Sequence, residues 1–225
     1  MDFFQIFEPF GNSIQQGFTN REWGGNFKKD QPEFAPSVAR LMKELNIPEP
    51  VTGNQVHGDV ILTLEKKPHE RPTCDAFITR VPNLPLMVKV ADCQGVLMYD
   101  PKTRTIAAGH SGWRGSALNI IGKTIAKLTR MGSDPADLLV AISPSIGPCC
   151  SEFTDPFREL PPTLHPYIYG KHVDFWAASI AQSLDAGIQK GHIEGADQCT
   201  RCHPNLYYSH RRGDLGRMAV FIALK

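Results

Sequence analysis

The chain has 225 residues, of which 41% are hydrophobic and 21% charged. This apolar content is enough to bury a core and excludes wholesale disorder, and the length fits one large domain or two small ones. Lys and Arg number 24 against 23 Asp and Glu, so the net charge of +1 provides no basic surface for a nucleic acid or an anionic membrane. The composition therefore favours a small-molecule partner and leaves the oligomeric state open.

Apolar runs and cysteines indicate the compartment. The runs 84–91 and 218–224 are far shorter than the roughly 20 residues of a membrane span. The N-terminus carries Asp2 and Glu8 where a secretory signal has basic residues and a long apolar core. Six cysteines in 225 residues are too few for a disulfide scaffold. We expect a cytoplasmic protein whose cysteines and eight histidines have individual roles.

The first third of the chain predicts strands, then a helix. Stretches 3–10 and 13–18 alternate enough between polar and apolar residues to form two strands. After a loop over 20–32, apolar residues recur every three or four positions between 37 and 45, and Pro48 closes the segment. This spacing predicts an amphipathic helix.

The remainder of the chain predicts a sheet with helices packed on it. Short β-rich runs separated by Pro, Gly and Asn give expected strands at 60–64, 76–79, 86–90, 96–99 and 105–108. One helix is expected along the stripe Leu118, Ile121, Ile125 and Leu128, and a second over 175–188. Further strands are expected at 138–142 and 218–224.

The organisation of these elements predicts the fold class. No internal repeat or linker interrupts residues 1–225, so we predict a single catalytic domain over that range. Helices that pack on a mainly β core give a mixed α/β (α+β) layered fold.

Three potential ligands follow expected strands. They are His57 in Gln55-Val56-His57-Gly58, Cys93 in Ala91-Asp92-Cys93-Gln94, and His110 in the segment 108–115. Two imidazoles and a thiolate bind zinc while leaving a fourth position open, which is typical of catalytic zinc. Separations of 36 and 17 positions match no compact zinc motif. From the residues alone, the favoured interpretation is hydrogen-bonded histidines at a sheet edge and a buried thiol.

Two arginines are candidate substrate-binding residues. Arg114 follows Gly112 at the expected start of a helix, where backbone donors, the helix dipole and a guanidinium suit a phosphate or carboxylate. The alternative is an ion pair with a structural carboxylate. Arg211, in the pair Arg211-Arg212, either adds positive potential to the pocket or is solvated.

Two carboxylates are candidate catalytic residues. Asp75 and Asp92 lie beside expected strands, and Asp92 precedes Cys93. Near zinc, a carboxylate can act as a general base or orient an imidazole ligand. Because neighbouring strand residues point to opposite faces, Asp92 can equally turn away from Cys93 and bind backbone amides.

The other cysteines give no clear prediction. Cys149 and Cys150 are adjacent, and Cys199 and Cys202 form a Cys-x-x-Cys motif. A single such motif does not complete a zinc ribbon, and it does not follow the first strand of a thioredoxin-like unit. We therefore assign these cysteines no role from the sequence.

A set of motifs in fixed order identifies the family. The motifs are Asn54-Gln55-Val56-His57-Gly58, the segment 74–79 leading to Val90-Ala91-Asp92-Cys93, Gly109-His110-Ser111-Gly112-Trp113-Arg114-Gly115, Ser145-Ile146-Gly147-Pro148-Cys149-Cys150, and Cys199-Thr200 followed by 208–212 and Gly216-Arg217. Together they resemble the YfiH family, also called laccase-domain, multicopper polyphenol oxidase-like, purine nucleoside phosphorylase or peptidoglycan editing factor proteins. The resemblance implies the YfiH fold and a zinc ion on His57, Cys93 and His110.

The resemblance also implies the reaction. A zinc-dependent purine nucleoside enzyme would use phosphate to cleave adenosine, inosine or methylthioadenosine into the base and a ribose 1-phosphate, and would deaminate adenosine to inosine. Its partners would be a purine nucleoside and phosphate.

Three alternatives to this function remain. The first is a copper polyphenol oxidoreductase; Cu²⁺ suits N/S ligands, but the eight histidines form no His-x-His pair. The second is a cysteine hydrolase or amidase with Cys93 as nucleophile and His110 or His57 as base. The third is a factor that edits peptidoglycan precursors.

Overall fold

The larger sheet forms the centre of the molecule. The computed structural model describes residues 1–195 and 197–225. Six strands lie in the order β10-β7-β5-β6-β3-β2, with bounds Ile193–Gly195, Leu139–Ile142, Gln94–Asp100, Thr105–Ser111, Ala76–Thr79 and Ile61–Leu64. The central strands β5, β6, β3 and β7 pair antiparallel, and the two edge strands β10 and β2 pair parallel.

A smaller antiparallel sheet covers one face of the larger one. Its order is β1-β11-β4 (Ile14–Phe18, Met218–Leu224 and Leu86–Val90). Val88, Val220 and Ile222 from this sheet share one buried cluster with Leu97 and Ile106 of the larger sheet. Because successive strand residues alternate in direction, the other side chains of β11 face away from this core.

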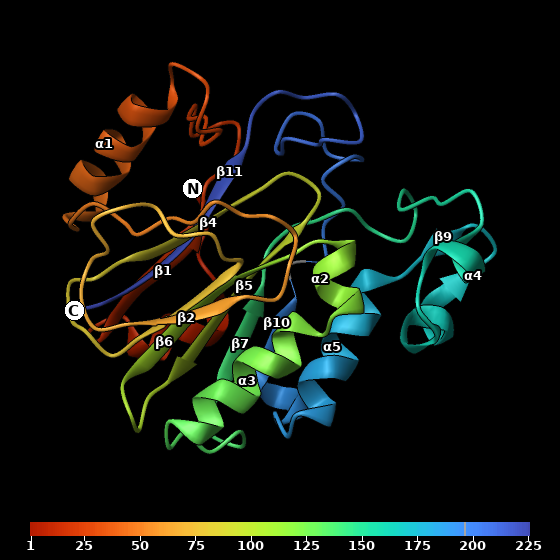
Figure 1. The fold of residues 1–225 in the computed structure, drawn as a ribbon. Coiled ribbons are helices and arrows are strands. Elements are labelled where there is room, and N and C mark those ends of the chain that lie inside the picture. Colours follow the sequence, from red (N-terminus) through yellow and green to blue (C-terminus); the bar gives the residue numbers. More distant parts are fainter. Residues whose placement is uncertain (196) are drawn as a thin grey trace.

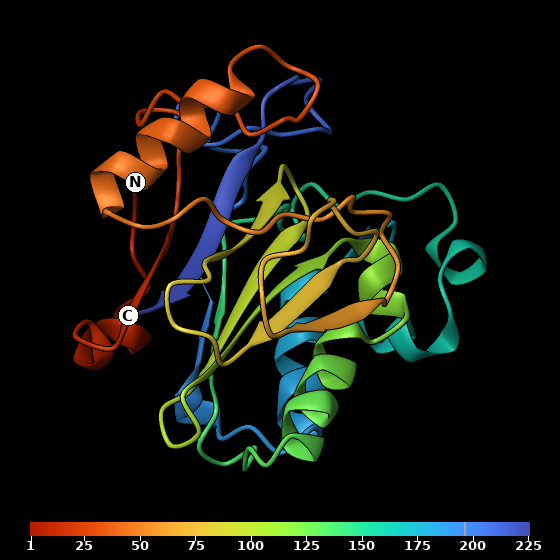
Figure 2. The ribbon, with the colours of Figure 1, turned by 60° about the vertical axis from the view of Figure 1, so that its left-hand side comes forward.

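Helices cover the two outer faces. Helix α1 (Phe34–Leu45) packs on the outward side chains of the small sheet, including Met87 and Phe221. Helices α3 (Ile120–Arg130) and α5 (Phe175–Asp185) lie against the far face of the larger sheet, where α3 shares a buried cluster with Val96 and Met98. Figure 2 shows the resulting layers in the order α1, small sheet, large sheet, α3 and α5. The prediction of a mixed α/β layered fold is confirmed.

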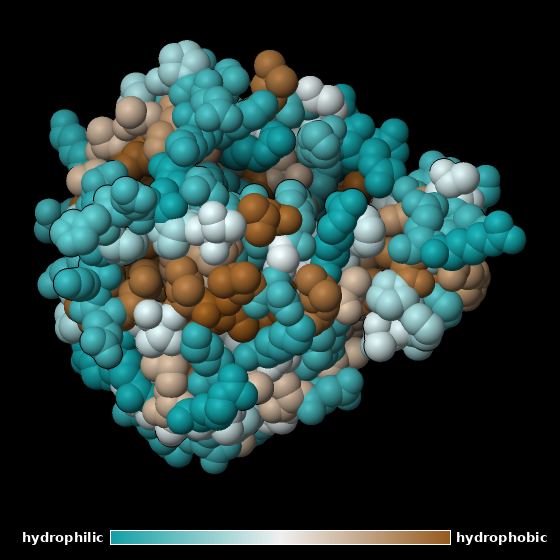
Figure 3. Space-filling model, viewed as in Figure 1, coloured by the Kyte–Doolittle hydropathy of each residue, from teal (hydrophilic) through white to brown (hydrophobic). Residues whose placement is uncertain are grey.

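The remaining elements are short. They are η1 (Gln5–Phe10), α2 (Trp113–Ala117), α4 (Pro156–Glu159), η2 (Pro162–Tyr167), the hairpin β8 (Ile168–Tyr169) and β9 (His172–Val173), and η3 (Lys190–His192). The segment with α4 and β9 projects from the body of the molecule (Figure 1). Polar side chains cover most of the face in Figure 3, and apolar ones gather over β2, a half-exposed edge strand. Among the described residues, none of the helices has the length and apolar character of a membrane span.

Two predicted elements at the N-terminus and in the middle are wrong. Residues 5–10 form a 3₁₀ helix with Pro9 inside it and Phe7 buried, because proline cannot donate to a strand ladder. The helix expected through Leu118 is two helices, α2 and α3, separated at Asn119. Asn119 has a left-handed φ of 55°, and its side chain accepts a hydrogen bond from the N–H of Gly122. This cap starts α3 anew and leaves Leu118 exposed.

The bounds of two other helices also differ from prediction. Helix α1 begins at Phe34, earlier than the apolar spacing indicated. Helix α5 ends at Asp185, and Gly187 follows with φ +96°, a conformation that favours glycine and ends helices.

Candidate metal centre and active site

His57, Cys93 and His110 meet at one end of the larger sheet. Cys93 lies in the turn between β4 and β5, His110 lies near the end of β6, and His57 lies in the loop before β2. One ligand atom from each residue lies within 4.8 Å of those of the other two. The two imidazole rings are 4.8 Å apart between centroids and nearly perpendicular, at 76°. His110 is buried, Cys93 is half-buried and His57 is exposed, so the cluster reaches from the core to the surface.

The buried carboxylate of Asp75 holds both histidines. It accepts hydrogen bonds from the backbone N–H groups of Val56, His57 and Gly58, at 3.2, 3.0 and 2.8 Å. Its Oδ1 also lies 2.8 Å from Nδ1 of His110. An ionised carboxylate only accepts, so Nδ1 of His110 carries a proton and donates it to Asp75, and Nε2 is the nitrogen that a metal would take in place of its proton.

Electrostatics favour the ligand form of the thiol. Burial opposes ionisation of Cys93, but the charge of His110 and hydrogen bonds from His110 and His57 outweigh it and lower the pKa of Cys93 to about 6. Burial likewise disfavours charge on His110, but the Cys93 thiolate and Asp75 raise the pKa of His110 to about 9. Burial also opposes charge on Asp75, and bonds from His110, Gly58 and Val56 keep the pKa of Asp75 below its usual range.

Gly112 leaves room for the cluster. A Cβ at this position would lie 2.9 Å from Sγ of Cys93 and 2.9 Å from Cδ2 of His57. The glycine therefore lets the chain pass directly beside the donor atoms. This donor set fits a zinc or copper ion. It offers Nε2 of His110, which points away from Asp75, a thiol that ionises readily, and a stretch of backbone without a side chain.

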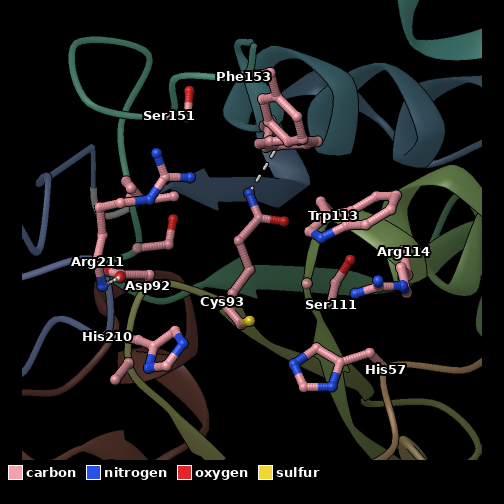
Figure 4. A pocket seen from close by; sticks show the side chains of 16 residues that line it. His57, Asp92, Cys93, Ser111, Trp113, Arg114, Ser151, Phe153, His210 and Arg211 are labelled. Atoms are coloured by element: carbon pink, nitrogen blue, oxygen red, sulfur yellow. Dashed lines mark hydrogen bonds between the residues drawn. The ribbon is translucent and has the colours of Figure 1, made fainter. Parts of the chain in front are cut away.

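A cavity of about 450 Å³ opens beside the cluster, within the size range of small-molecule sites. One side of it is lined by Trp113, Phe153 and Phe175. The ring centroid of Phe153 lies 6.1 Å from that of Trp113 and 6.1 Å from that of Phe175. In Figure 4 the Cys93 sulfur lies between His210 on one side and His57 on the other. The cavity thus places an apolar aromatic wall within reach of the potential metal ligands.

Two guanidinium groups line this cavity from opposite sides (Figure 4). Arg114 is exposed, and its Cζ atom lies over the Trp113 ring, 4.1 Å from the ring centroid. Among the described residues, Arg114 forms no ion pair. Arg211 donates to the carbonyl of Glu152 at 2.9 Å. Helix α2, which carries Arg114, has only five residues, so an anion here would be bound by the guanidinium more than by a helix dipole.

Asp92 connects the cluster to the loop that carries Arg211. Its backbone φ is +77°, which turns the chain just before Cys93. Its carboxylate accepts hydrogen bonds from Oγ1 of Thr200 and from the backbone N–H of Arg211, both at 2.6 Å. The side chain therefore fastens the loop that carries Arg211 while lining the same cavity as Cys93.

A family model described as multi-copper polyphenol oxidoreductase laccase matches residues 10–225. The chain belongs to this family. Among relatives, "Purine nucleoside phosphorylase YlmD" of Geobacillus stearothermophilus is 32% identical over 94% of this chain and 86% of its own. "Purine nucleoside phosphorylase YfiH" of Escherichia coli is 31% identical over 82% of this chain and 78% of its own. The crystal structure of YlmD from G. stearothermophilus is similar with a TM-score of 0.87, 29% identity, and coverage of 97% and 94%.

In this laccase-family chain a second hollow of about 310 Å³ borders the same cluster. His57, Cys93 and His110 line it together with Lys28, Lys29, Lys89 and Arg217. Burial, followed by repulsion from Arg71 and Lys29, lowers the pKa of Lys89 to about 8. Sequence reasoning gave these basic residues no role, because they come from three separate segments and only Arg217 lies in one of the family motifs.

Proposed function

We propose that residues 1–225 are a single catalytic domain of a zinc-dependent purine nucleoside phosphorylase. The observation that carries this proposal is the His57, Cys93 and His110 cluster at the edge of a cavity that has an aromatic wall and an exposed arginine, Arg114. Relatives named purine nucleoside phosphorylase support it. The six thiols, none of them in a disulfide, suit the cytoplasm.

Each group of residues has a part in the proposed reaction. His57, Cys93 and His110 would hold Zn²⁺, with Cu²⁺ as the other ion that this donor set accepts. When bound, the ion supplies Lewis-acid stabilisation of negative charge. The Trp113 side of the cavity stacks against the purine, and Arg114 binds and orients the phosphate. Arg211, on the opposite side, adds positive potential, while Asp75 and Asp92 position the cluster and the loop.

The bond changes define the products. An oxygen of phosphate forms a bond to C1′ of the ribose while the C1′–N9 bond breaks, and the departing purine takes up a proton. Inosine gives hypoxanthine, adenosine gives adenine, and methylthioadenosine gives adenine and the methylthio sugar phosphate. In the second activity, water replaces the C6 amine of adenosine and ammonia leaves. Both reactions accept the same purine ring against the same aromatic wall.

The test is product analysis with zinc-replete protein. Inosine, adenosine and methylthioadenosine are incubated with and without phosphate, and bases and sugar phosphates are quantified. We expect free base and sugar phosphate in equal amounts only with phosphate, and inosine from adenosine without it. Arg114→Met should raise the KM for phosphate, and Arg130→Met, at the far end of α3, serves as the matched control. Absence of all these products at high protein concentration overturns the proposal.

The family model's description raises copper oxidation as a competing activity. Among the described residues, His57 and His110 are the only histidines found in a potential ligand group, whereas a multicopper centre needs several histidines together. We therefore expect zinc in protein purified without added copper, and no oxidation of phenols. Copper with phenol oxidation would favour the oxidoreductase.

One observation favours a second candidate, a cysteine hydrolase. Cys93, His110 and Asp75 form a chain of thiol, imidazole and carboxylate, which is the arrangement that activates a nucleophilic cysteine. A thiolate bound to zinc is a poor nucleophile, so the two functions compete for Cys93. Alkylation of Cys93 that becomes faster after chelation, with loss of activity, favours the metal enzyme. Alkylation at equal rates with and without chelator favours the hydrolase.

A further inference from the structure

Four cysteine sulfurs outside the first cluster lie together. Cys149 and Cys150 come from the loop after β7, and Cys199 and Cys202 come from the loop between β10 and β11. All four sulfurs lie within 4.8 Å of one another. The Cys-x-x-Cys motif has no second such motif in the sequence, but in the structure the adjacent pair Cys149 and Cys150 supplies two further sulfurs beside it.

The spacing of the sulfurs matches a tetrahedral metal site. Sγ of Cys202 lies 3.6 Å from Sγ of Cys149 and 3.5 Å from Sγ of Cys150. Zn–S bonds of about 2.3 Å in a tetrahedron separate the sulfurs by roughly 3.8 Å. A disulfide requires sulfurs about 2.05 Å apart, and none of the six cysteines forms one.

Polar groups lie close to the Cys-x-x-Cys turn. The backbone N–H groups of Gly147, Cys202 and Arg201 lie near the sulfur of Cys199. The guanidinium of Arg212 donates to the carbonyls of Thr200 and Arg201 at 3.0 Å, which places a positive charge beside the Cys-x-x-Cys turn. Backbone N–H groups that point at a sulfur stabilise a thiolate ligand in the way that outer hydrogen bonds stabilise other metal ligands.

We propose that Cys149, Cys150, Cys199 and Cys202 bind one zinc ion as a second, structural site. The four thiols release their protons to solvent on binding, and no electrons are transferred. Four sulfur ligands close the coordination shell, so this ion has no open position for substrate. The site is separate from His57, Cys93 and His110, and it does not depend on the proposed reaction.

The second site would fasten two loops that line the cavity. Ser145 pairs with Cys199 in a parallel bridge, and the same loop continues to Ser151 in the cavity wall. The other loop continues from Cys202 to Arg211. Zinc binding at the four cysteines would therefore fix the two loops of the cavity wall relative to each other. The hydrogen bond from Thr200 to Asp92 fixes one of these loops in a similar way.

Zinc content measured by elemental analysis of the full chain tests the proposal. We expect about two zinc equivalents per chain in the wild type. Cys202→Ser, at an exposed position, should lose about one equivalent and keep the other. His57→Ala should lose the other one independently, and Cys74→Ala, outside both clusters, should lose none. With Co²⁺ in place of zinc, the charge-transfer absorption of a tetrathiolate site should vanish in Cys202→Ser and persist in His57→Ala.

Labelling of the wild type provides a test that needs no variant. We expect the four cysteines to react with a thiol reagent only after a chelator removes the metal, and to be recovered as free thiols. Equal labelling with and without chelator, a disulfide to Cys202 in freshly purified protein, or wild-type zinc content in Cys202→Ser would each overturn the proposal. The His57→Ala protein separates this outcome from failure of the proposed phosphorylase, because its remaining zinc reports on the four cysteines alone.

Discussion

Substitution of Asp75 by Asn tests how the first metal site is built. The Asp75 carboxylate is fully buried and accepts four hydrogen bonds, three from the loop that carries His57 and one from His110. An asparagine has the same shape, but its NH₂ group donates. It would face donors that have no other acceptor, and His110 would lose the group that fixes its tautomer.

The magnitude follows from these bonds. A hydrogen bond to a charged group contributes about 1.5 to 3 kcal/mol. If two of the four donors lose their acceptor, the free energy of unfolding falls by roughly 3 to 6 kcal/mol. Loss of a group that orients a metal-bound histidine weakens metal binding by roughly 10- to 100-fold. We therefore expect Asp75→Asn to bind zinc at least tenfold more weakly and to lose activity in proportion.

The assay compares two buried aspartates. Zinc dissociation constants come from competition with a chromophoric chelator, and unfolding free energies come from urea titration of metal-free protein. Asp100→Asn is the matched control, because Asp100 is equally buried and accepts bonds from Lys102 and Thr103 far from the site. It should lower stability without changing zinc affinity. Wild-type zinc affinity in Asp75→Asn would refute the assignment of Asp75 as a positioning residue.

Three further predictions concern the same site. Gly112→Ala should weaken zinc binding at least about tenfold, because the new Cβ would collide with Cys93 and His57. Gly109→Ala is the control, since its Cβ would lie 3.7 Å from its nearest neighbour, Cβ of Ala76. This variant should bind zinc normally in the same competition assay. Arg114→Met should raise the KM for phosphate by roughly tenfold or more without changing zinc content, and an unchanged KM would place the phosphate elsewhere. Chelation should abolish product formation and added zinc should restore it, whereas activity that survives verified metal removal would contradict a metal-dependent reaction.

Short apolar runs were the most reliable guide to the fold. The bounds of β3, β4 and β11 were predicted to the residue, because β-branched and apolar runs between turn residues have few alternatives. The apolar residues from Leu118 to Leu128 wrongly predicted one continuous helix. Their helical spacing continues across Asn119, whose left-handed backbone separates α2 from α3. A single side-chain cap thus decided a boundary that periodicity could not show.

The candidate site was predicted from motifs more than from chemistry. His57, Cys93 and His110 are too far apart in sequence to indicate a metal by spacing. Their residue types and places beside expected strands made them candidates, and the family resemblance decided in favour of a metal site. The role of Asp75 depends on a loop that folds back to place three backbone N–H groups at one carboxylate. The four-cysteine cluster likewise requires two loops 50 positions apart to meet, which no local pattern encodes.

The most direct test of the metal centre is a crystal structure of zinc-replete, active protein with diffraction measured on both sides of the zinc absorption edge. An anomalous peak bounded by His57, Cys93 and His110, with Nε2 of His110 as the ligand, is the predicted result. Active protein whose map shows no metal among these three side chains would contradict the account.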